Sequence, residues 1–356
     1  MYVLVQNEEV LPCSLPSGAW LEAAPRGAYT TARTVEGGSS VFELSFHIDR
    51  LASSAALMMQ ADAAAAAGRA DGPAATAAGE YGAPAPSSAA AEAADPEKLH
   101  PRLLSALRAA VRGYRASTGD AASELKLTVL LTWPGCQQPG GQPGGSAAVA
   151  SRDSVADATA SSGTGAGAEV FVHASPLPTR PAPPVRVVMR GAPRSNAAAK
   201  DSEWVRQRKA IEAGLPRDIN EAVLVGAGGA LFEGLTSNFF AVMDGTVYTA
   251  GTGVLAGTVR EVILQVAARE GIPVVLEPPR LADLHRWEGC FISSTSRLLL
   301  PVDEASVFPE GAEGSAPQDG SGAGPTTRRF PRGGLVQRLE QLVLAEVAAC
   351  SEPLFD

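Results

Sequence analysis

The stretch 221–260 constrains the fold of this chain more than any other part of the sequence. Short apolar runs flank the glycine-rich residues 226–229, and another apolar run turns at Asp244-Gly245. Such turns between apolar runs are typical of β-hairpins, because these residues adopt the positive φ angles that tight turns require. A Gly-rich loop at 251–257 then precedes a helix expected to begin at Thr258. The stretch therefore predicts an antiparallel meander followed by a helix.

The other expected elements also favour an α+β fold, with antiparallel hairpins rather than repeating βαβ units. Residues 11–26 contain Pro and Gly and are expected to form a loop. Apolar periodicity predicts strands at 2–5, 28–34, 40–44, 125–133, 169–173, 185–189, 273–276 and 290–293, and helices at 47–59, 100–117, 203–213, 258–269, 281–285 and 335–349.

Three segments, at about 61–96, 134–168 and 310–327, consist mostly of small residues. They contain too little large apolar surface to offset the entropy cost of ordering the chain, so we interpret them as flexible insertions. The Pro-rich segment 176–184 is stiff and lies between stretches that look folded. The sequence therefore predicts an N-terminal α+β domain at 1–178 and a C-terminal domain at 179–356.

The net charge and the positions of the cysteines exclude several kinds of ligand and site. The formal net charge of -9 argues against a nucleic-acid-binding surface. No apolar run approaches the length of a membrane helix, and the N-terminal residues resemble neither a signal nor a transit peptide. The four cysteines form no CxxC pair, so no metal site or disulfide framework is predicted. We expect a cytoplasmic protein that binds a small molecule.

Two residues around the meander are candidates for covalent chemistry. Glu233 lies inside the meander and is followed by small polar residues. Lysines are scarce, and Lys200 lies just before a helix on the segment that leads into the meander. Taken alone, each has an ordinary explanation, as a strand carboxylate facing water and an exposed loop lysine. In combination they fit an amine held for Schiff-base chemistry beside a carboxylate.

A pyridoxal cofactor would use such a combination. Its aldehyde needs a lysine, and its ring nitrogen needs a carboxylate so that the ring acts as an electron sink. Its phosphate needs N–H donors and a cation, which a helix start at 257–259 and either Arg50 or Arg260 would supply. Ser294 and Thr295, which follow a strand, would add donors. Each residue also has a structural explanation, such as a helix cap, and only their joint occurrence favours the cofactor.

The runs EGLTSNFF, VLAGTVR and FISSTSRLLLPV, in this order, resemble the class IV, fold-type IV pyridoxal-phosphate enzymes. That family includes branched-chain and D-amino acid aminotransferases and aminodeoxychorismate lyase. The N-terminal run GAYTTARTVEGGSSVFELSFHIDRLASSA resembles the opening of the same family. The resemblance covers most of the chain outside the three insertions. It implies a two-domain fold-type IV structure, bound pyridoxal 5'-phosphate and a homodimer.

The resemblance also implies roles for individual residues. Lys200 matches the lysine that holds the cofactor, and Glu233 matches the carboxylate at the ring nitrogen. Arg50 matches the arginine that binds the phosphate. The remaining matches are Thr258 and Val259 at the phosphate-binding helix start, Ser294 and Thr295 at further cofactor contacts, and Tyr29 and Thr31 on the substrate side.

The substrate side departs from the family pattern. Residues 23–27 stand where the family commonly has Gly-Asp-Gly. Thr132 and Trp133 stand where D-amino acid aminotransferases place residues that bind the substrate carboxylate. Thr30 and Thr31 in GAYTTAR resemble the lyase more than the aminotransferases. We therefore predict amino transfer between an amino acid and a 2-oxo acid, with pyruvate release by a lyase and cofactor binding without turnover as alternatives.

Overall fold

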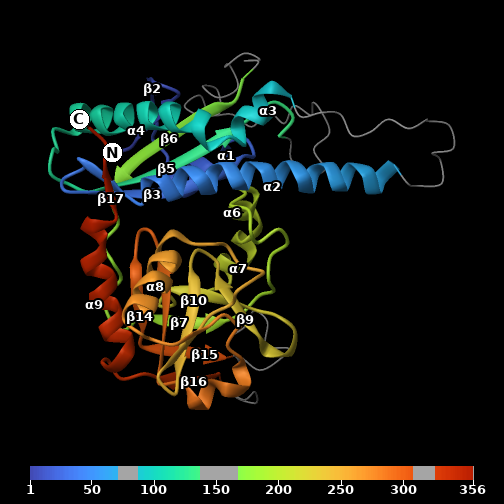
Figure 1. The fold of residues 1–356 in the computed structure, drawn as a ribbon, viewed down its shortest axis with the longest axis vertical. Coiled ribbons are helices and arrows are strands. Elements are labelled where there is room, and N and C mark those ends of the chain that lie inside the picture. The colour runs from blue at the N-terminus through green and yellow to red at the C-terminus, as the bar shows by residue number, and fades with distance from the viewer. Residues whose placement is uncertain (71–86, 137–166, 308–324, 356) are drawn as a thin grey trace. The chain divides into compact units, whose positions relative to one another are not determined.

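The structure, a computed structural model, describes residues 1–70, 87–136, 167–307 and 325–355 (Figure 1). Its contacts group the chain into two compact units, each with its own β-sheet. The first unit comprises Met1–Leu177, Ala199–Arg206 and Ser351–Asp356, and the second comprises Pro178–Ala198 and Gln207–Cys350. The mixed α+β class expected from the sequence is confirmed. The division into domains 1–178 and 179–356 stays a prediction.

The first unit is built on a seven-stranded antiparallel sheet in the order β17-β4-β3-β5-β6-β1-β2. Its strands are β1 (Val3–Gln6), β2 (Glu9–Leu11), β3 (Ala28–Val35), β4 (Ser40–Phe42), β5 (Leu125–Thr132), β6 (Glu169–Pro176) and β17 (Ser351–Pro353). Side chains alternate between the two faces along each strand, so one face carries the core and the other carries Tyr29 and Thr31.

Helices α2 (Leu44–Ala70) and α4 (Pro96–Thr118) pack on the core face of this sheet, and α3 (Ser88–Ala93) packs against these two helices (Figure 1). Local chemistry explains where α4 begins and ends. The Asp95 side chain accepts hydrogen bonds from two first-turn N–H groups, and Pro96 follows it. Gly119 ends the helix in the left-handed conformation.

Two expectations for the first unit are wrong. The loop expected at 11–26 contains helix α1 (Ser17–Ala23), which begins after Pro16 because Trp20 and Leu21 bury their side chains in an apolar cluster with Tyr29. The insertion expected at 61–96 is helical at 61–70 and 88–93, since alanine is the best helix former and needs little apolar area to extend a helix. Residues 71–86 lie outside the described part of the chain.

The second unit is built on a ten-stranded sheet, with the path β12-β11-β10-β9-β8-β7-β15-β16 and the pair β13-β14 joined to β10. Its strands are β7 (Arg186–Met189), β8 (Glu221–Val225), β9 (Leu231–Gly234), β10 (Asn238–Met243), β11 (Thr246–Tyr248), β12 (Val274–Val275), β13 (Gly289–Ser294), β14 (Leu298–Val302), β15 (Glu304–Val307) and β16 (Thr326–Arg329). The meander β8-β9-β10-β11 confirms the strands and turns predicted in the stretch 221–260.

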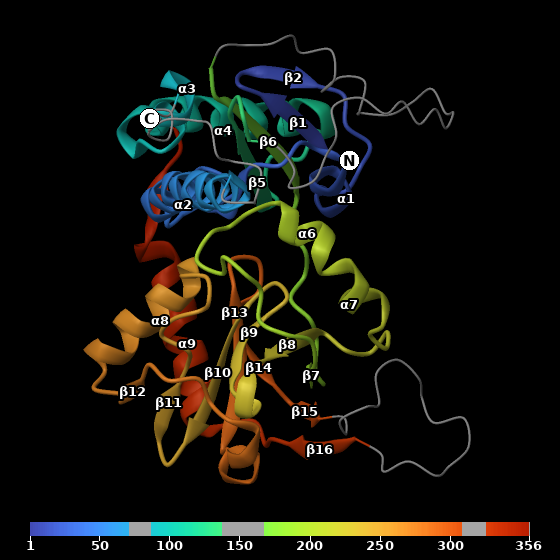
Figure 2. The same ribbon diagram turned by 90° about the vertical axis from the view of Figure 1, so that its right-hand side faces the viewer.

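Helices α8 (Thr258–Arg269) and α9 (Gly334–Ala349) pack side by side against this sheet (Figure 2). The apolar residues of α8 recur at helical spacing and are buried. Within the sheet, Phe240 of β10 stacks on Phe291 of β13 with 4.6 Å between ring centroids. The predicted bounds of α8 are confirmed. Short helical segments complete the unit, namely α7 (Lys209–Ala213) and the 3-10 turns η1 (Ala227–Gly229) and η2 (Leu281–Arg286).

Three details differ from the sequence predictions. The helix expected at 203–213 is split into α6 (Glu203–Gln207) and α7. Strands β14 to β17 were not predicted, and β16 begins inside the insertion expected at 310–327. Residues 310–324 of that insertion, and most of the one expected at 134–168, lie outside the described residues. Within the described ranges, no helix is long and apolar enough to cross a membrane.

Candidate active site

The residues expected at the site divide between the two units, and each unit brings its own residues together. The first unit holds Tyr29, Thr31, Arg50 and Lys200, and the second holds Glu233, Thr258, Val259, Ser294 and Thr295.

Lys200 is held in place by β3, a strand within the N-terminal run that resembles the family. Its carbonyl accepts a hydrogen bond of 2.9 Å from the Tyr29 N–H, and its own N–H donates to Oγ of Ser54 at 3.0 Å. Asp201 bridges to Ala28, so the Lys200 segment lies as a short antiparallel extension beside β3. The Nζ atom lies 4.6 Å from the centroid of the Tyr29 ring. The expected catalytic lysine and the expected substrate-side tyrosine are therefore neighbours.

An arginine ties this segment to the rest of the first unit. Arg26 is 5% exposed, and its Nε and Nη2 atoms donate to the Asp201 carboxylate at 2.9 and 2.7 Å. Its Nη1 atom donates to both carboxylate oxygens of Asp62 at 2.9 Å. Because the guanidinium binds the residue directly after Lys200, it restrains the backbone that carries the lysine.

Arg50 on α2 is buried together with two neutral partners. Its Nη2 atom donates to Oγ1 of Thr30 at 2.6 Å and lies 3.1 Å from Nδ1 of His47. Thr30 Oγ1 and His47 Nδ1 are 2.8 Å apart. Burial lowers the pKa of Arg50 to about 10, which still leaves the guanidinium charged near neutral pH. A buried cation of this kind suits a phosphate, as expected from the sequence.

Tyr29 and Thr31 lie on the sheet face opposite helices α2 and α4. Tyr29 is buried in the cluster that contains Trp20, whereas Thr31 is half-buried and pairs in register with Thr128 of β5. Thr30 points to the other face, toward Arg50. The two neighbouring threonines of the run GAYTTAR therefore serve different faces of the sheet.

Buried histidines of the first unit make its stability depend on pH. Burial, with the charges of Arg50 and Lys200, holds the pKa of His47 well below its usual value, and burial also lowers the pKa of His173. In the unfolded chain both imidazoles bind protons near pH 6.5, whereas in the folded chain their lowered pKa values mean that they bind protons only at lower pH. The unfolded state therefore gains protons first as pH falls. Stability is then lost below about pH 6.5, at up to about 1.4 kcal/mol per pH unit for each histidine.

This expectation is checked by urea unfolding at several values between about pH 5.5 and about pH 7.5. His173→Gln should flatten the dependence of the unfolding free energy on pH. His100→Gln changes an exposed residue of α4 and should leave that dependence as in the wild type. Equal pH dependence in the wild type and in His173→Gln would contradict the expectation for His173.

In the second unit, Glu233 forms a buried ion pair. Its Oε1 atom accepts a hydrogen bond of 2.8 Å from Nε of Arg194, and both side chains are 6% exposed. Its Oε2 atom accepts from the Leu255 N–H at 3.0 Å. Arg194 also donates to the carbonyl of Ala197. The carboxylate is therefore fixed on one side by an arginine and on the other by the loop that leads to α8.

Strand register places Glu233 beside the start of α8. Asn238 pairs with Glu233 on one side and with Ser293 on the other, so the three residues form a row across β9, β10 and β13. The Asn238 amide donates to the Leu255 carbonyl at 2.7 Å. A β-carbon at Gly257 would lie 2.0 Å from Oδ1 of Asn238, so only glycine allows the loop to approach this closely.

The first turn of α8 leaves polar groups available for an anion. Its N-cap, Gly257, has no side chain to accept from the first N–H groups. The hydroxyls of Thr258 and Ser293 are buried and have no hydrogen-bond partner among the described residues. Val259 is buried in the same turn. Arg260 instead donates to the Ala250 carbonyl at 2.9 Å and so holds the preceding loop. Uncapped N–H groups and unpartnered hydroxyls fit a phosphate.

Ser294 and Thr295 end β13. The Ser294 hydroxyl accepts from Nε of Arg297 at 3.2 Å, so it also stabilises the turn after the strand. Thr295 is buried. Arg297 further donates to Glu221 at 2.6 Å and to Thr236 at 2.7 Å. Ser294 thus stabilises the turn between β13 and β14 and does not cap a helix.

Five residues around the expected site were not predicted as site residues, namely Arg26, Thr30, His47, Arg194 and Asn238. A signal existed for three of them, because Thr30, His47 and Asn238 lie inside the runs that resemble the family. Arg26 and Arg194 are identified only by their distant carboxylate partners, 175 and 39 residues away.

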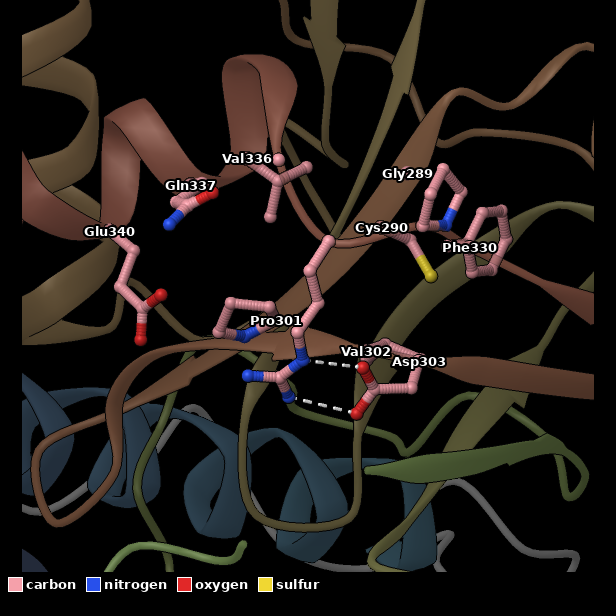
Figure 3. Close-up of a pocket in the computed structure, with 12 residues that line it drawn as sticks. Gly289, Cys290, Pro301, Val302, Asp303, Phe330, Val336, Gln337 and Glu340 are labelled. Carbon is pink, nitrogen blue, oxygen red and sulfur yellow. Dashed lines mark hydrogen bonds and ion pairs between the residues drawn. The ribbon is translucent and has the colours of Figure 1, made fainter. Parts of the chain in front are cut away.

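A pocket in the second unit lies apart from these residues. Figure 3 shows it between β13, β14 and the start of α9, where Arg332 pairs with Asp303 at 2.8 Å. None of the nine expected site residues lines it. Across the described ranges, no group of three or more His, Cys, Asp or Glu side chains is arranged to hold a metal ion.

Comparison with known proteins gives matches to one family over part of the chain. Residues 140–305 match the family model of amino-transferase class IV. The match assigns this part of the chain to the class IV family. A putative branched-chain-amino-acid aminotransferase of Methanocaldococcus jannaschii is 36% identical over 88 residues, and this match covers 24% of the present chain and 31% of that relative. The chain thus spans about a third of the length of this class IV relative.

Solved structures show the fold of the chain over nearly its full length. A hypothetical aminotransferase from Mycobacterium tuberculosis, in a PLP-bound form, covers 98% of this chain and 99% of its own, with 18% identity and a TM-score of 0.60. A fold IV-transaminase from Curtobacterium pusillum gives the same coverage, 19% identity and a TM-score of 0.61. The predicted fold-type IV architecture is therefore confirmed.

Proposed function

We propose that this chain is a pyridoxal-phosphate-dependent aminotransferase that moves an amino group between an amino acid and a 2-oxo acid. The observation that carries the proposal is the joining of Glu233 to the start of α8 through the Leu255 N–H. A buried carboxylate and an uncapped helix start with unpartnered hydroxyls supply the two groups that the ring nitrogen and the phosphate of this cofactor require.

The bound cofactor would supply an electron sink for the negative charge that develops at the substrate α-carbon. Lys200 would hold the cofactor and then, as a free amine, take the α-proton and return it. Glu233 would keep a proton on the ring nitrogen, and Arg194 would keep Glu233 in place. Arg50 and the N–H groups of the first turn of α8 would bind the phosphate.

Reduction with borohydride tests the proposal. Purified protein with pyridoxal phosphate should absorb in the visible range, and reduction should fix the cofactor on Lys200, as mapped by mass spectrometry of peptides. Lys200→Ala should abolish this labelling, whereas Lys209→Ala, on α7, should not. Labelling of a different lysine, or the absence of bound cofactor, would contradict the assignment.

Two alternatives differ in products rather than in cofactor. The first alternative is a lyase, which would use Lys200 to release pyruvate. Thr31 belongs to the run that resembles the lyase, and it is half-buried on the same sheet face as Tyr29. A protein that binds the cofactor without turnover would absorb but would not exchange its amino group with any amino acid. Half-transamination with a panel of amino donors, beside an assay for pyruvate release, separates the three. A homodimer and a cytoplasmic location remain predictions from the sequence.

A further inference from the structure

Arg50 lies in a buried cluster with Thr30 and His47, two side chains that the proposed reaction does not use directly. Thr30 is 0% exposed, His47 1% and Arg50 9%. Thr30 comes from β3, and the other two come from successive turns of α2. The three polar atoms involved lie within 3.1 Å of one another in every pairing.

Counting protons fixes the direction of each hydrogen bond. The guanidinium has only donors, so Nη2 of Arg50 donates to Oγ1 of Thr30 and can donate to Nδ1 of His47. The hydroxyl of Thr30 has one proton, and Nδ1 of His47 is the acceptor 2.8 Å away. His47 is therefore neutral, with its proton on Nε2. Thr30 accepts from the arginine and donates to the histidine, so it links the two.

From this geometry we infer that Thr30 and His47 are positioning residues that aim the Arg50 guanidinium at the phosphate of the cofactor. The inference rests on the proposed function, because it assumes that Arg50 binds that phosphate. Two neutral acceptors on Nη2 fix the rotation of the guanidinium plane without neutralising its charge. A carboxylate in the same place would pair with the arginine and weaken its attraction for an anion. A threonine and a neutral histidine bring no negative charge to the guanidinium.

The test compares two ligands that differ only in the phosphate, namely pyridoxal phosphate and pyridoxal. Dissociation constants are measured by the visible absorption of the full-length protein. Thr30→Val keeps the shape and removes both hydrogen bonds, and we expect it to weaken binding of pyridoxal phosphate about tenfold. Binding of pyridoxal should change by less than about twofold. Thr30→Ser keeps the hydroxyl and should restore the wild-type preference.

Matched variants separate positioning from general damage. Thr34→Val removes a hydroxyl from the same strand that is also fully buried but bonds to Glu124 and Leu125, so it should leave the preference for the phosphorylated ligand unchanged. His47→Leu provides a second variant of the cluster and should reduce the preference in the same direction as Thr30→Val.

The outcomes are distinguishable. The first case is that wild type prefers pyridoxal phosphate and Arg50→Gln removes that preference. If Thr30→Val then weakens the binding of both ligands equally, or changes neither, the positioning role is overturned. A wild-type protein that binds both ligands equally, or neither, would overturn the proposed function and this inference with it.

Discussion

Arg26→Ala is expected to lower the unfolding free energy by about 3 kcal/mol and to prevent labelling of Lys200 by borohydride. The guanidinium is 5% exposed and binds two carboxylates, so its removal leaves Asp201 and Asp62 without their counter-charge. We place the loss at the lower end of the range for buried pairs because Asp62 is 38% exposed, and water replaces part of its lost interaction. Asp201 is 15% exposed and follows Lys200, so the lysine should lose its fixed backbone position.

Urea unfolding and borohydride labelling measure the two effects separately. Asp62→Asn should cost less stability than Asp201→Asn, because its carboxylate is the more exposed partner. Arg286→Ala removes an arginine from an exposed pair with Asp244 and should leave both measurements unchanged. Unfolding of Arg26→Ala at the wild-type urea concentration, with normal labelling, would show that the Arg26 pairs do not hold the lysine segment.

Glu233→Gln is expected to slow half-transamination by about a hundredfold to a thousandfold, the range found when one preorganised electrostatic partner is removed. The amide has nearly the shape of the carboxylate, so the hydrogen bond from the Leu255 N–H can persist. It has no negative charge to keep a proton on the ring nitrogen, and it removes the charge that pairs with the buried Arg194 guanidinium. The variant should therefore bind the cofactor but react slowly with an amino donor.

Glu221→Gln is a matched control in the same unit. Glu221 is 4% exposed and pairs with Arg297 at 2.6 Å, so this substitution also breaks a buried ion pair. It should lower stability to a similar degree while leaving the rate of half-transamination close to that of the wild type. An equal loss of rate in Glu221→Gln would attribute the effect of Glu233→Gln to structural damage rather than to the cofactor ring.

Local chemistry predicted the central part of the fold. The turn residues at Asp244-Gly245 have φ angles of 50° and 69°, as their sequence requires, and α8 has the predicted bounds. Elements that depend on distant partners were missed. Strand β15 pairs with β7 and β16, and neither β15 nor β16 has an apolar pattern that marks it as a strand. Helix α1 was missed because the nearby Pro and Gly outweighed the apolar pair Trp20-Leu21.

The residues of the candidate site also fall into those that the sequence predicted and those that depend on distant partners. Motif resemblance named Glu233 and Thr258, and the structure joins the carboxylate and the helix start through one loop. The partners that hold the reactive groups were beyond the sequence. Arg194 lies close to Lys200 in the sequence but bonds to a strand far along the chain, and Arg26 reaches a residue 175 positions away. Charge pairs of this kind depend on the folded path of the chain, which no local pattern specifies.

The first unit contains segments that are far apart in the sequence, and this has a consequence for synthesis on the ribosome. Its sheet includes β17, which pairs with β4, and both lie in a unit whose other strands end at Pro176. The ribosome releases β17 only after the whole of the second unit. Until then the edge of β4 has unpaired N–H and C=O groups that can recruit a strand from another nascent chain. The last strand to emerge therefore closes the sheet that was begun first.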